Sequence, residues 1–310
     1  MNRIYSISKR KFYFIITFII CVQFSIAHQL GLYGYGIDFR YFYGQRENFF
    51  VLTRIVDNLG FLLATLTIYQ IHLGVLVTSL LYSISNLYLF DTFLKERKVI
   101  LLLSVALCLH TWPIIMGVSN GMRQAIMASF LTFAVVKASK TQNIPVVLIM
   151  LCVLSHNSGL FFSGILIFSL LQLKYLRLTR LRIIFFAVCG FLLSFYAAKY
   201  LIVPGGTRII GGDFRYPFLL INFSISIFLF FRSNLTAPQL FLFYTNFCAP
   251  AVLIQGGNYE YERLNQVLVL LNIIILGNML KSSQQRILVP ITMFVFVMMT
   301  YATGMFSGLK

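Results

Sequence analysis

The sequence predicts an all-α, polytopic integral membrane protein with about ten or eleven membrane-crossing segments. Of its 310 residues, 59% are hydrophobic and only 11% are charged, whereas a soluble domain carries about 25% charged residues. The mean hydropathy is +0.86. The apolar runs are continuous rather than alternating, which indicates helices, because backbone at membrane depth must bond within a helix or within a closed barrel.

The apolar runs follow one another with only short polar gaps, and about 20 residues of helix are enough to cross the hydrocarbon core. The run 61–90 is long enough to tilt, or to break near His72 to Gly74. No linker to a soluble domain interrupts the series, so we expect one polytopic domain over residues 1–310. The predicted segments are 12–30, 61–90, 99–117, 121–138, 144–155, 158–171, 183–203, 216–231, 239–254, 264–280 and 287–302.

A polar loop is predicted between the first two spans, over residues 31–59. Its first part, 31–46, is rich in glycine and tyrosine. Residues 47–59 then place apolar side chains such as Phe50 and Ile55 on one helical face and charged ones on the other. This segment is too short to span, so we expect an amphipathic helix lying at the outer membrane interface.

The basic residues predict the orientation. With the N-terminus inside, most lysines and arginines fall in inner loops, as in other membrane proteins. This pattern explains the net charge of +17 without a nucleic-acid partner. Six of the eight acids fall on the outer side, together with seven arginines that oppose the topological bias. These arginines are Arg40, Arg46, Arg54, Arg123, Arg208, Arg215 and Arg263.

A guanidinium group offers a planar fork of donors that suits phosphate. The outer arginines therefore predict a site for a phosphorylated ligand, the alternative being that they pair with the outer acids and only fold the loops. Arg123 begins the predicted helix 121–138. There its charge adds to the helix dipole and to free N–H groups, which makes an anion site; the alternative is a side chain that snorkels to the surface.

A short helix ends at a polar cluster around His156. Residues 144–155 extend about 18 Å as a helix, which is too short to cross a bilayer. An interrupted helix at that depth is tolerated where it lines a watered cavity, and an ionisable group there is a functional candidate. Histidine suits proton transfer. Alternatively, His156 only hydrogen-bonds a neighbouring helix.

Other chemistries lack a sequence signal. The five cysteines all lie inside apolar runs, which is typical of small buried side chains. The sequence has no Cys/His metal spacing and no P-loop. We therefore expect neither a metal nor a nucleotide cofactor.

Four patches resemble the EpsG-type, Wzy-like family of bacterial polysaccharide polymerases, in the same order along the chain. They are Gly36-Ile37-Asp38-Phe39-Arg40-Tyr41, Asn120-Gly121-Met122-Arg123-Gln124-Ala125-Ile126, Leu154-Ser155-His156-Asn157-Ser158 and Tyr261-Glu262-Arg263-Leu264. Together they are spread over most of the chain, from about residue 35 to about residue 265. The Asn157-Ser158-Gly159 stretch departs from the commoner family forms after the histidine.

The resemblance implies an activity. Such enzymes join undecaprenyl-diphosphate-linked oligosaccharide repeat units on the outer face of the cytoplasmic membrane, for O-antigen, capsule or exopolysaccharide. They require no soluble cofactor. Their partners are the lipid-linked oligosaccharide, the bilayer, a flippase and a chain-length regulator.

The resemblance also suggests residue roles. His156 is the expected base, with Asp38 or Glu262 as the alternative. Residues expected to bind the diphosphate and the sugar are Arg123, Arg263, Arg215, Arg208, Arg40, Tyr41 and Gln124. Two other functions stay open: a flippase for the same lipid-linked sugar, and another lipid-dependent transferase such as an O-antigen ligase or an O-acyltransferase.

Overall fold

A computed structural model describes most of the chain from residue 71 onward. The described ranges are 71–94, 99–111, 113–115, 121–176, 178–201, 215–232 and 234–302, with a few residues between 12 and 23. Within these ranges every regular element is a helix, which confirms the all-α prediction. The predicted outer loop 31–59 lies outside the described residues, as do Asp38, Arg40, Tyr41 and Arg208.

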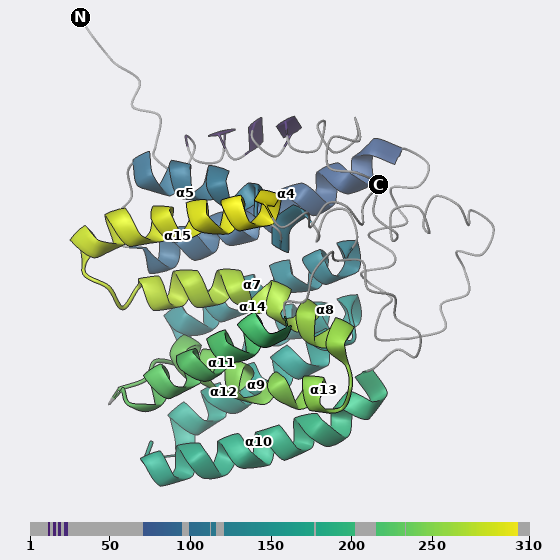
Figure 1. Cartoon of the computed structure of the whole chain (residues 1–310), viewed down its shortest axis with the longest axis vertical. Coiled ribbons are helices and arrows are strands. Elements are labelled where there is room, and N and C mark those ends of the chain that lie inside the picture. The colour runs from purple at the N-terminus through teal and green to yellow at the C-terminus, as the bar shows by residue number, and fades with distance from the viewer. Residues whose placement is uncertain are drawn as a thin grey trace, which may run out of the picture.

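The helices run across the molecule in a stack, from α4, α5 and α15 on one side to α10 on the other (Figure 1). Where the connections are described, as between α7 and α8 and between α8 and α9, they are short and reverse the chain, so these neighbours are antiparallel. The bounds are α4 Ile71–Phe93, α5 Val99–Leu109, α7 Met122–Thr141, α8 Val146–Ser155, α9 Ser158–Tyr175, α10 Arg180–Leu201, α11 Arg215–Phe230, α12 Ala237–Cys248, α13 Pro250–Ile254, α14 Asn258–Gly277 and α15 Ser282–Ala302.

Several predicted spans can be compared with the helices that the structure describes. Of the predicted run 61–90, the described part is one continuous helix from Ile71 through His72 to Gly74, and residues 61–70 lie outside the described residues. The predicted span 99–117 is interrupted after Leu109, where the Thr111 hydroxyl donates to the carbonyl of Cys108 at 2.6 Å and closes a turn. The span 239–254 is confirmed as the helical segment Ala237–Ile254, with an interruption between α12 and α13 at Pro250, which lacks the N–H that a helix interior needs.

The hairpin around His156 also differs from its prediction. The first arm, α8, is as short as expected, with 10 residues. The second arm, α9, continues to Tyr175 and has 18 residues, about 27 Å of helix. Only one arm of the hairpin is therefore short.

Three helical segments in the described part of the chain are long and apolar enough to cross a membrane. They are Ser158–Tyr175, Arg180–Lys199 and Ala237–Ile254. Other long helices have polar side chains that face the protein interior. In α14 these include buried Asn265, Gln266 and Asn272, so its composition reflects burial inside the bundle.

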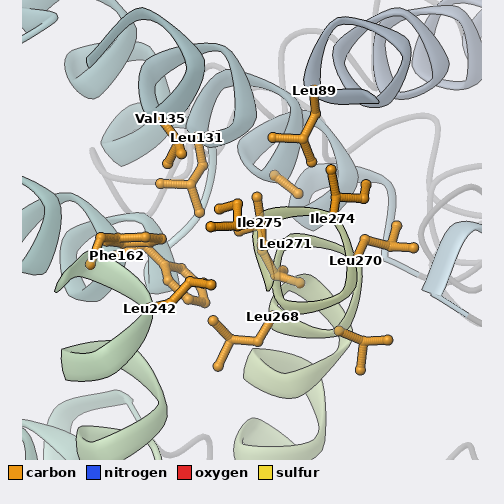
Figure 2. Close-up of a cluster of buried hydrophobic side chains, with 14 of the residues drawn as sticks. Leu89, Leu131, Val135, Phe162, Leu242, Leu268, Leu270, Leu271, Ile274 and Ile275 are labelled. Carbon is orange, nitrogen blue, oxygen red and sulfur yellow. The ribbon is translucent and has the colours of Figure 1, made fainter. Parts of the chain in front are cut away.

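Helix α14 is central to the hydrophobic core. Figure 2 shows its Leu268, Leu271 and Ile275 among side chains from four other helices. The neighbours drawn there are Leu89 from α4, Leu131 and Val135 from α7, Phe162 from α9 and Leu242 from α12. This core joins helices from distant parts of the chain into one body.

Polar side chains also link the helices across the core. Asn246 of α12 and Asn272 of α14 exchange two amide hydrogen bonds, of 2.9 and 3.0 Å. Tyr244 of α12 donates to Gln172 of α9 at 2.6 Å. Interhelical bonds of this kind contribute about 0.6 kcal/mol each in an apolar medium, and they also fix which faces of the helices meet.

A glycine allows α8 and α9 to pack closely. A Cβ atom added to Gly159 would lie 2.3 Å from the carbonyl oxygen of Cys152 and 2.7 Å from its carbonyl carbon. Both are backbone atoms, so neither can move without shifting α8. At Gly164, further along the same helix, an added Cβ would meet no atom within 4 Å.

These two glycines provide a matched stability test. Gly159→Ala is expected to lower the free energy of unfolding by about 1–3 kcal/mol, because overpacking forces backbone shifts. Gly164→Ala is expected to be neutral or to stabilise the protein by up to about 1 kcal/mol, because alanine favours helix. Thermal unfolding of the detergent-solubilised protein measures both. Equal melting temperatures for the two variants would contradict the close packing at Gly159.

Candidate functional site

The two ends of the bundle differ in charge. The end where α7, α9, α11 and α14 begin, here called the site end, has Arg123, Arg215 and Arg263 together with Glu260 and Glu262. The opposite end, where α7, α9, α11 and α14 finish, is here called the lysine end. The basic residues described there are Lys137, Lys140, Lys174, Arg180, Arg182, Arg232, Lys281 and Arg286.

At the site end the fold brings together residues from three of the four sequence patches. The guanidinium charges of Arg123 and Arg263 both act on the imidazole of His156. The side-chain amide of Gln124 donates to the backbone carbonyl of Arg263 at 2.5 Å, which joins the first turn of α7 to α14. We call Arg123, Gln124, His156, Ser158 and Arg263 the cationic cluster.

The start of α14 positions Arg263. The guanidinium carbon of Arg263 lies 4.3 Å from the centroid of the Tyr259 ring, one helical turn earlier, and this cation–π contact orients the side chain. The apolar run predicts that this helix begins near Leu264, whereas it begins at Asn258. The role of Tyr259 was therefore missed, although its i, i+4 spacing from Arg263 was a usable signal.

A glycine turn sets where α14 begins. Gly256 has φ of +88°, and its N–H donates to Leu253 at 2.9 Å while that of Gly257 donates to Val252 at 3.1 Å. This pair of bonds ends α13 in the Schellman arrangement, which favours glycine at the left-handed position. The Gly256-Gly257 pair was the sequence signal for this boundary.

Helix α11 is held against the start of α14 by one buried bond. The amide of Asn222 donates to the hydroxyl of Tyr261 at 3.0 Å. Arg215 is the first residue of α11, two turns before Asn222, and its guanidinium lies 5.7 Å from the Tyr216 ring. Arg215 thus belongs to the site end, beside the helix that carries Arg263.

Glu262 lies in the protein interior. Its side chain is 0% exposed, in the second turn of α14. A buried carboxylate is costly unless nearby positive charge or donors compensate, and the N-terminal part of a helix contributes partial positive charge. The adjacent Arg263 is partly exposed, so these neighbours in sequence face different surroundings.

His156 is held by the turn between α8 and α9. Its Nδ1 accepts a hydrogen bond from the backbone N–H of Ser158 at 3.2 Å and lies 2.8 Å from the Ser158 hydroxyl oxygen. A backbone N–H can only donate, so Nδ1 is the acceptor and the neutral ring carries its proton on Nε2. The Ser158 hydroxyl then donates to Nδ1. Within the described part of the chain, this local cap is the hydrogen bonding that His156 makes.

The surroundings of His156 keep its ring neutral. Burial lowers the pKa of His156 well below its usual 6.5, and the positive charges of Arg123 and Arg263 lower it further. A neutral imidazole can accept a proton, and an imidazolium cannot. Among the described residues, no three His, Cys, Asp or Glu side chains are grouped so as to hold a metal ion.

Together these features favour binding of an anion beside a proton acceptor. Two guanidinium groups and the beginnings of α7 and α14 supply positive charge, and helix N-termini bind phosphate readily. The neutral His156 and the Ser158 hydroxyl are next to that charge. Of the other predicted residues, Gln124 has a positioning role, because its amide is used on the backbone of α14.

The electrostatic contact within the cationic cluster can be measured directly. The chain has four histidines, so ¹³C-histidine NMR in lipid nanodiscs, assigned with His156→Gln, can follow His156. We expect its ring to stay neutral below pH 6.5 and its pKa to rise in Arg123→Gln and in Arg263→Gln. Because the unfolded chain binds this proton more readily, stability should fall as the pH drops through 6.5. If the pKa of His156 is unchanged in both arginine variants, neither guanidinium group acts on the His156 ring.

No protein-family model, curated protein or solved structure matches this chain. The cationic cluster is therefore defined by its own geometry and by the sequence patches that contribute to it.

Proposed function

We propose that this chain is a membrane glycosyltransferase that polymerises oligosaccharide repeat units linked to undecaprenyl diphosphate, on the outer face of the bacterial cytoplasmic membrane. The observation that carries the proposal is the meeting of Arg123, His156 and Arg263 at one end of the bundle. These residues come from three of the four patches that resemble the EpsG-type, Wzy-like polymerases. A diphosphate leaving group and an attacking hydroxyl need the cations and the proton acceptor found there.

The charge asymmetry supports a polytopic membrane placement with the site facing outward. Four of the five lysines in the described residues are at the lysine end, and only Lys199 is towards the site end. Basic residues stay on the cytoplasmic side of bacterial membrane proteins. The cationic cluster then faces the periplasm or the exterior. The apolar segments in α9, α10 and α12–α13 supply lengths that match the hydrocarbon core.

In the proposed reaction a sugar hydroxyl of one repeat unit attacks the anomeric carbon of the growing chain. A new C–O bond forms at that carbon, and the bond to the diphosphate oxygen breaks. Undecaprenyl diphosphate leaves with both electrons of that bond. The developing negative charge is stabilised by Arg123 and Arg263. Arg263 is already held in position, by Gln124 at its backbone carbonyl and by Tyr259 at its guanidinium. Preorganised charge of this kind is often the largest catalytic contribution.

The proton of the attacking hydroxyl follows the Ser158–His156 pair. Ser158 Oγ accepts the sugar proton as its own proton passes to Nδ1 of His156, along the 2.8 Å contact. The proton takes up the Nδ1 lone pair, so the hydrogen bond from the Ser158 N–H to Nδ1 is lost as the imidazolium forms. The imidazolium that forms keeps its Nε2–H. Energy comes from the lipid-linked donor, so the reaction needs no nucleotide or soluble cofactor.

Glycan length in cells tests the function. The wild-type chain should restore a long-chain ladder on electrophoresis to a strain that lacks the gene, which otherwise shows single-repeat material. Arg123→Ala is expected to lower polymerisation by about 10²–10³-fold, as loss of one charge-stabilising donor does, while the protein still accumulates. Arg232→Ala, which removes an exposed arginine at the lysine end, is the control and should keep the ladder.

The alternatives give other patterns in the same experiment. Loss of even the single-repeat material from the surface in the deletion strain indicates a flippase or a ligase. A glycan of normal length that lacks an acyl group indicates an O-acyltransferase. A full ladder from Arg123→Ala at normal protein levels removes the role of Arg123 in binding diphosphate.

The proton route has its own test. Ser158→Ala retains the backbone N–H that caps His156 but removes the hydroxyl, so the rate should fall about 10²–10⁴-fold with lipid binding unchanged. Ser169→Ala is the matched control on α9, because among the described residues that hydroxyl bonds only the carbonyl of Ile165, at 2.8 Å. Rates are measured on purified protein with synthetic lipid-linked repeat units. A fully active Ser158→Ala would leave His156 with only its capping role.

A further inference from the structure

An apolar groove lies between α9, α10 and α12. Its volume is about 600 Å³, within the range of about 300–1,000 Å³ typical of ligand sites. Its wall includes four aromatic rings, Phe161, Phe168, Phe186 and Tyr244. The Phe168 ring makes edge contacts with Phe186 at 5.1 Å and with Tyr244 at 5.4 Å. Since the Tyr244 hydroxyl also bonds Gln172 at 2.6 Å, the wall is preformed.

Two glycines give the groove its width. Gly164 of α9 and Gly190 of α10 both line it. An added Cβ at Gly164 would project into open space, so the volume in front of it belongs to the groove rather than to a packed neighbour. Any larger side chain at Gly164 would occupy that volume.

The groove opens on the apolar exterior of the bundle. Leu193 on its edge is 71% exposed and Leu160 is 52% exposed. Outside the groove, α10 also exposes apolar side chains such as Val188 and Leu192. In the proposed membrane placement this exterior faces lipid, so a hydrocarbon chain can enter from the side.

One end of the groove lies within one helical turn of Ser158, a member of the cationic cluster. Leu160 and Phe161 follow Ser158 by two and three residues in the first turn of α9, about 3–5 Å along the helix axis. Ser158 in turn contacts His156. A single molecule with an anionic head and a hydrocarbon tail can therefore occupy the cationic cluster and the groove together.

We infer that this groove binds the first part of the polyprenyl chain of the lipid diphosphate whose head lies at Arg123 and Arg263. The inference rests on the proposed function and identifies where the lipid portion of its substrate is held. The positive charge of Arg123 and Arg263 suits a diphosphate head. Because the groove begins in the first turn of α9, next to Ser158, its occupant is expected to be the chain attached to that head. The limited volume leaves the rest of a long chain in the bilayer.

Photocrosslinking from the groove edge tests the inference. Benzoylphenylalanine is placed at Leu193, and at exposed Val188 of the same helix as the control, in full-length protein in nanodiscs of phosphatidylethanolamine and phosphatidylglycerol. The probe is radiolabelled undecaprenyl diphosphate. We expect several-fold more labelled adduct from position 193 than from position 188, and competition by unlabelled undecaprenyl diphosphate.

Filling the groove should remove this adduct. Gly164→Leu places a branched side chain in the open volume and is expected to lose the adduct at position 193, whereas Gly164→Ala is expected to keep most of it. Val188→Leu adds bulk to α10 outside the groove and should leave the adduct unchanged. Melting temperatures of the three variants show whether each is folded.

The opposing outcomes are distinct. Equal adducts from positions 188 and 193, an adduct that persists in folded Gly164→Leu, or crosslinks to nanodisc phospholipid or to a second copy of the chain would overturn the groove assignment. If wild-type protein restores the glycan ladder without a position-specific adduct, only the groove assignment fails. If the adduct forms and the ladder is not restored, the groove binds lipid and the polymerase proposal fails.

Discussion

The constraint on which the structure depends is that an apolar bundle must satisfy its buried polar groups internally. Helix α14 meets it with bonds to several neighbours, among them Tyr261 to α11, Asn272 to α12 and the backbone of Arg263 to α7. Gln266 adds a bond to the carbonyl of Pro113 at 3.0 Å. An unsatisfied polar group in such surroundings costs several kcal/mol, so these contacts fix the packing of α14.

The same constraint places the site. Because α14 is fixed in the centre, its first turns and those of α7 must share one end of the bundle, and this brings Arg123 and Arg263 to bear on His156. Burial first, and then the two positive charges, disfavour the protonated imidazole and lower the pKa of His156.

The α8–α9 turn lies between the cationic cluster and the apolar exterior of the bundle. Gly159 brings the two helices together at Cys152, and the residues of α9 from Leu160 onward line the groove. Polar and apolar surfaces thus meet within a single helical turn. A ligand with a charged head and a hydrocarbon tail needs a polar and an apolar surface next to each other, because each surface binds one part of the molecule.

Much of the fold could be predicted from the sequence, since the cause of each helix is local. Runs of apolar residues predicted the existence of α7 to α15, and the polar His156-Asn157 pair predicted the end of α8. The distribution of basic residues along the chain predicted which helix ends lie on the same side of the bundle. Boundaries failed where the decisive signal was a turn rather than an apolar run, as at Thr111 and at Gly256 before α14.

The sequence by itself determined the helical class, the order of the helices and the residue types available at the site end, because apolar length and charge distribution act along the chain. Only the tertiary structure decided that residues 139 positions apart, Gln124 and Arg263, are in contact, that Glu262 is buried while Arg263 is partly exposed, and that three helices leave a groove open. These features depend on which helix faces meet. Packing between distant segments sets that choice, and no local pattern encodes it.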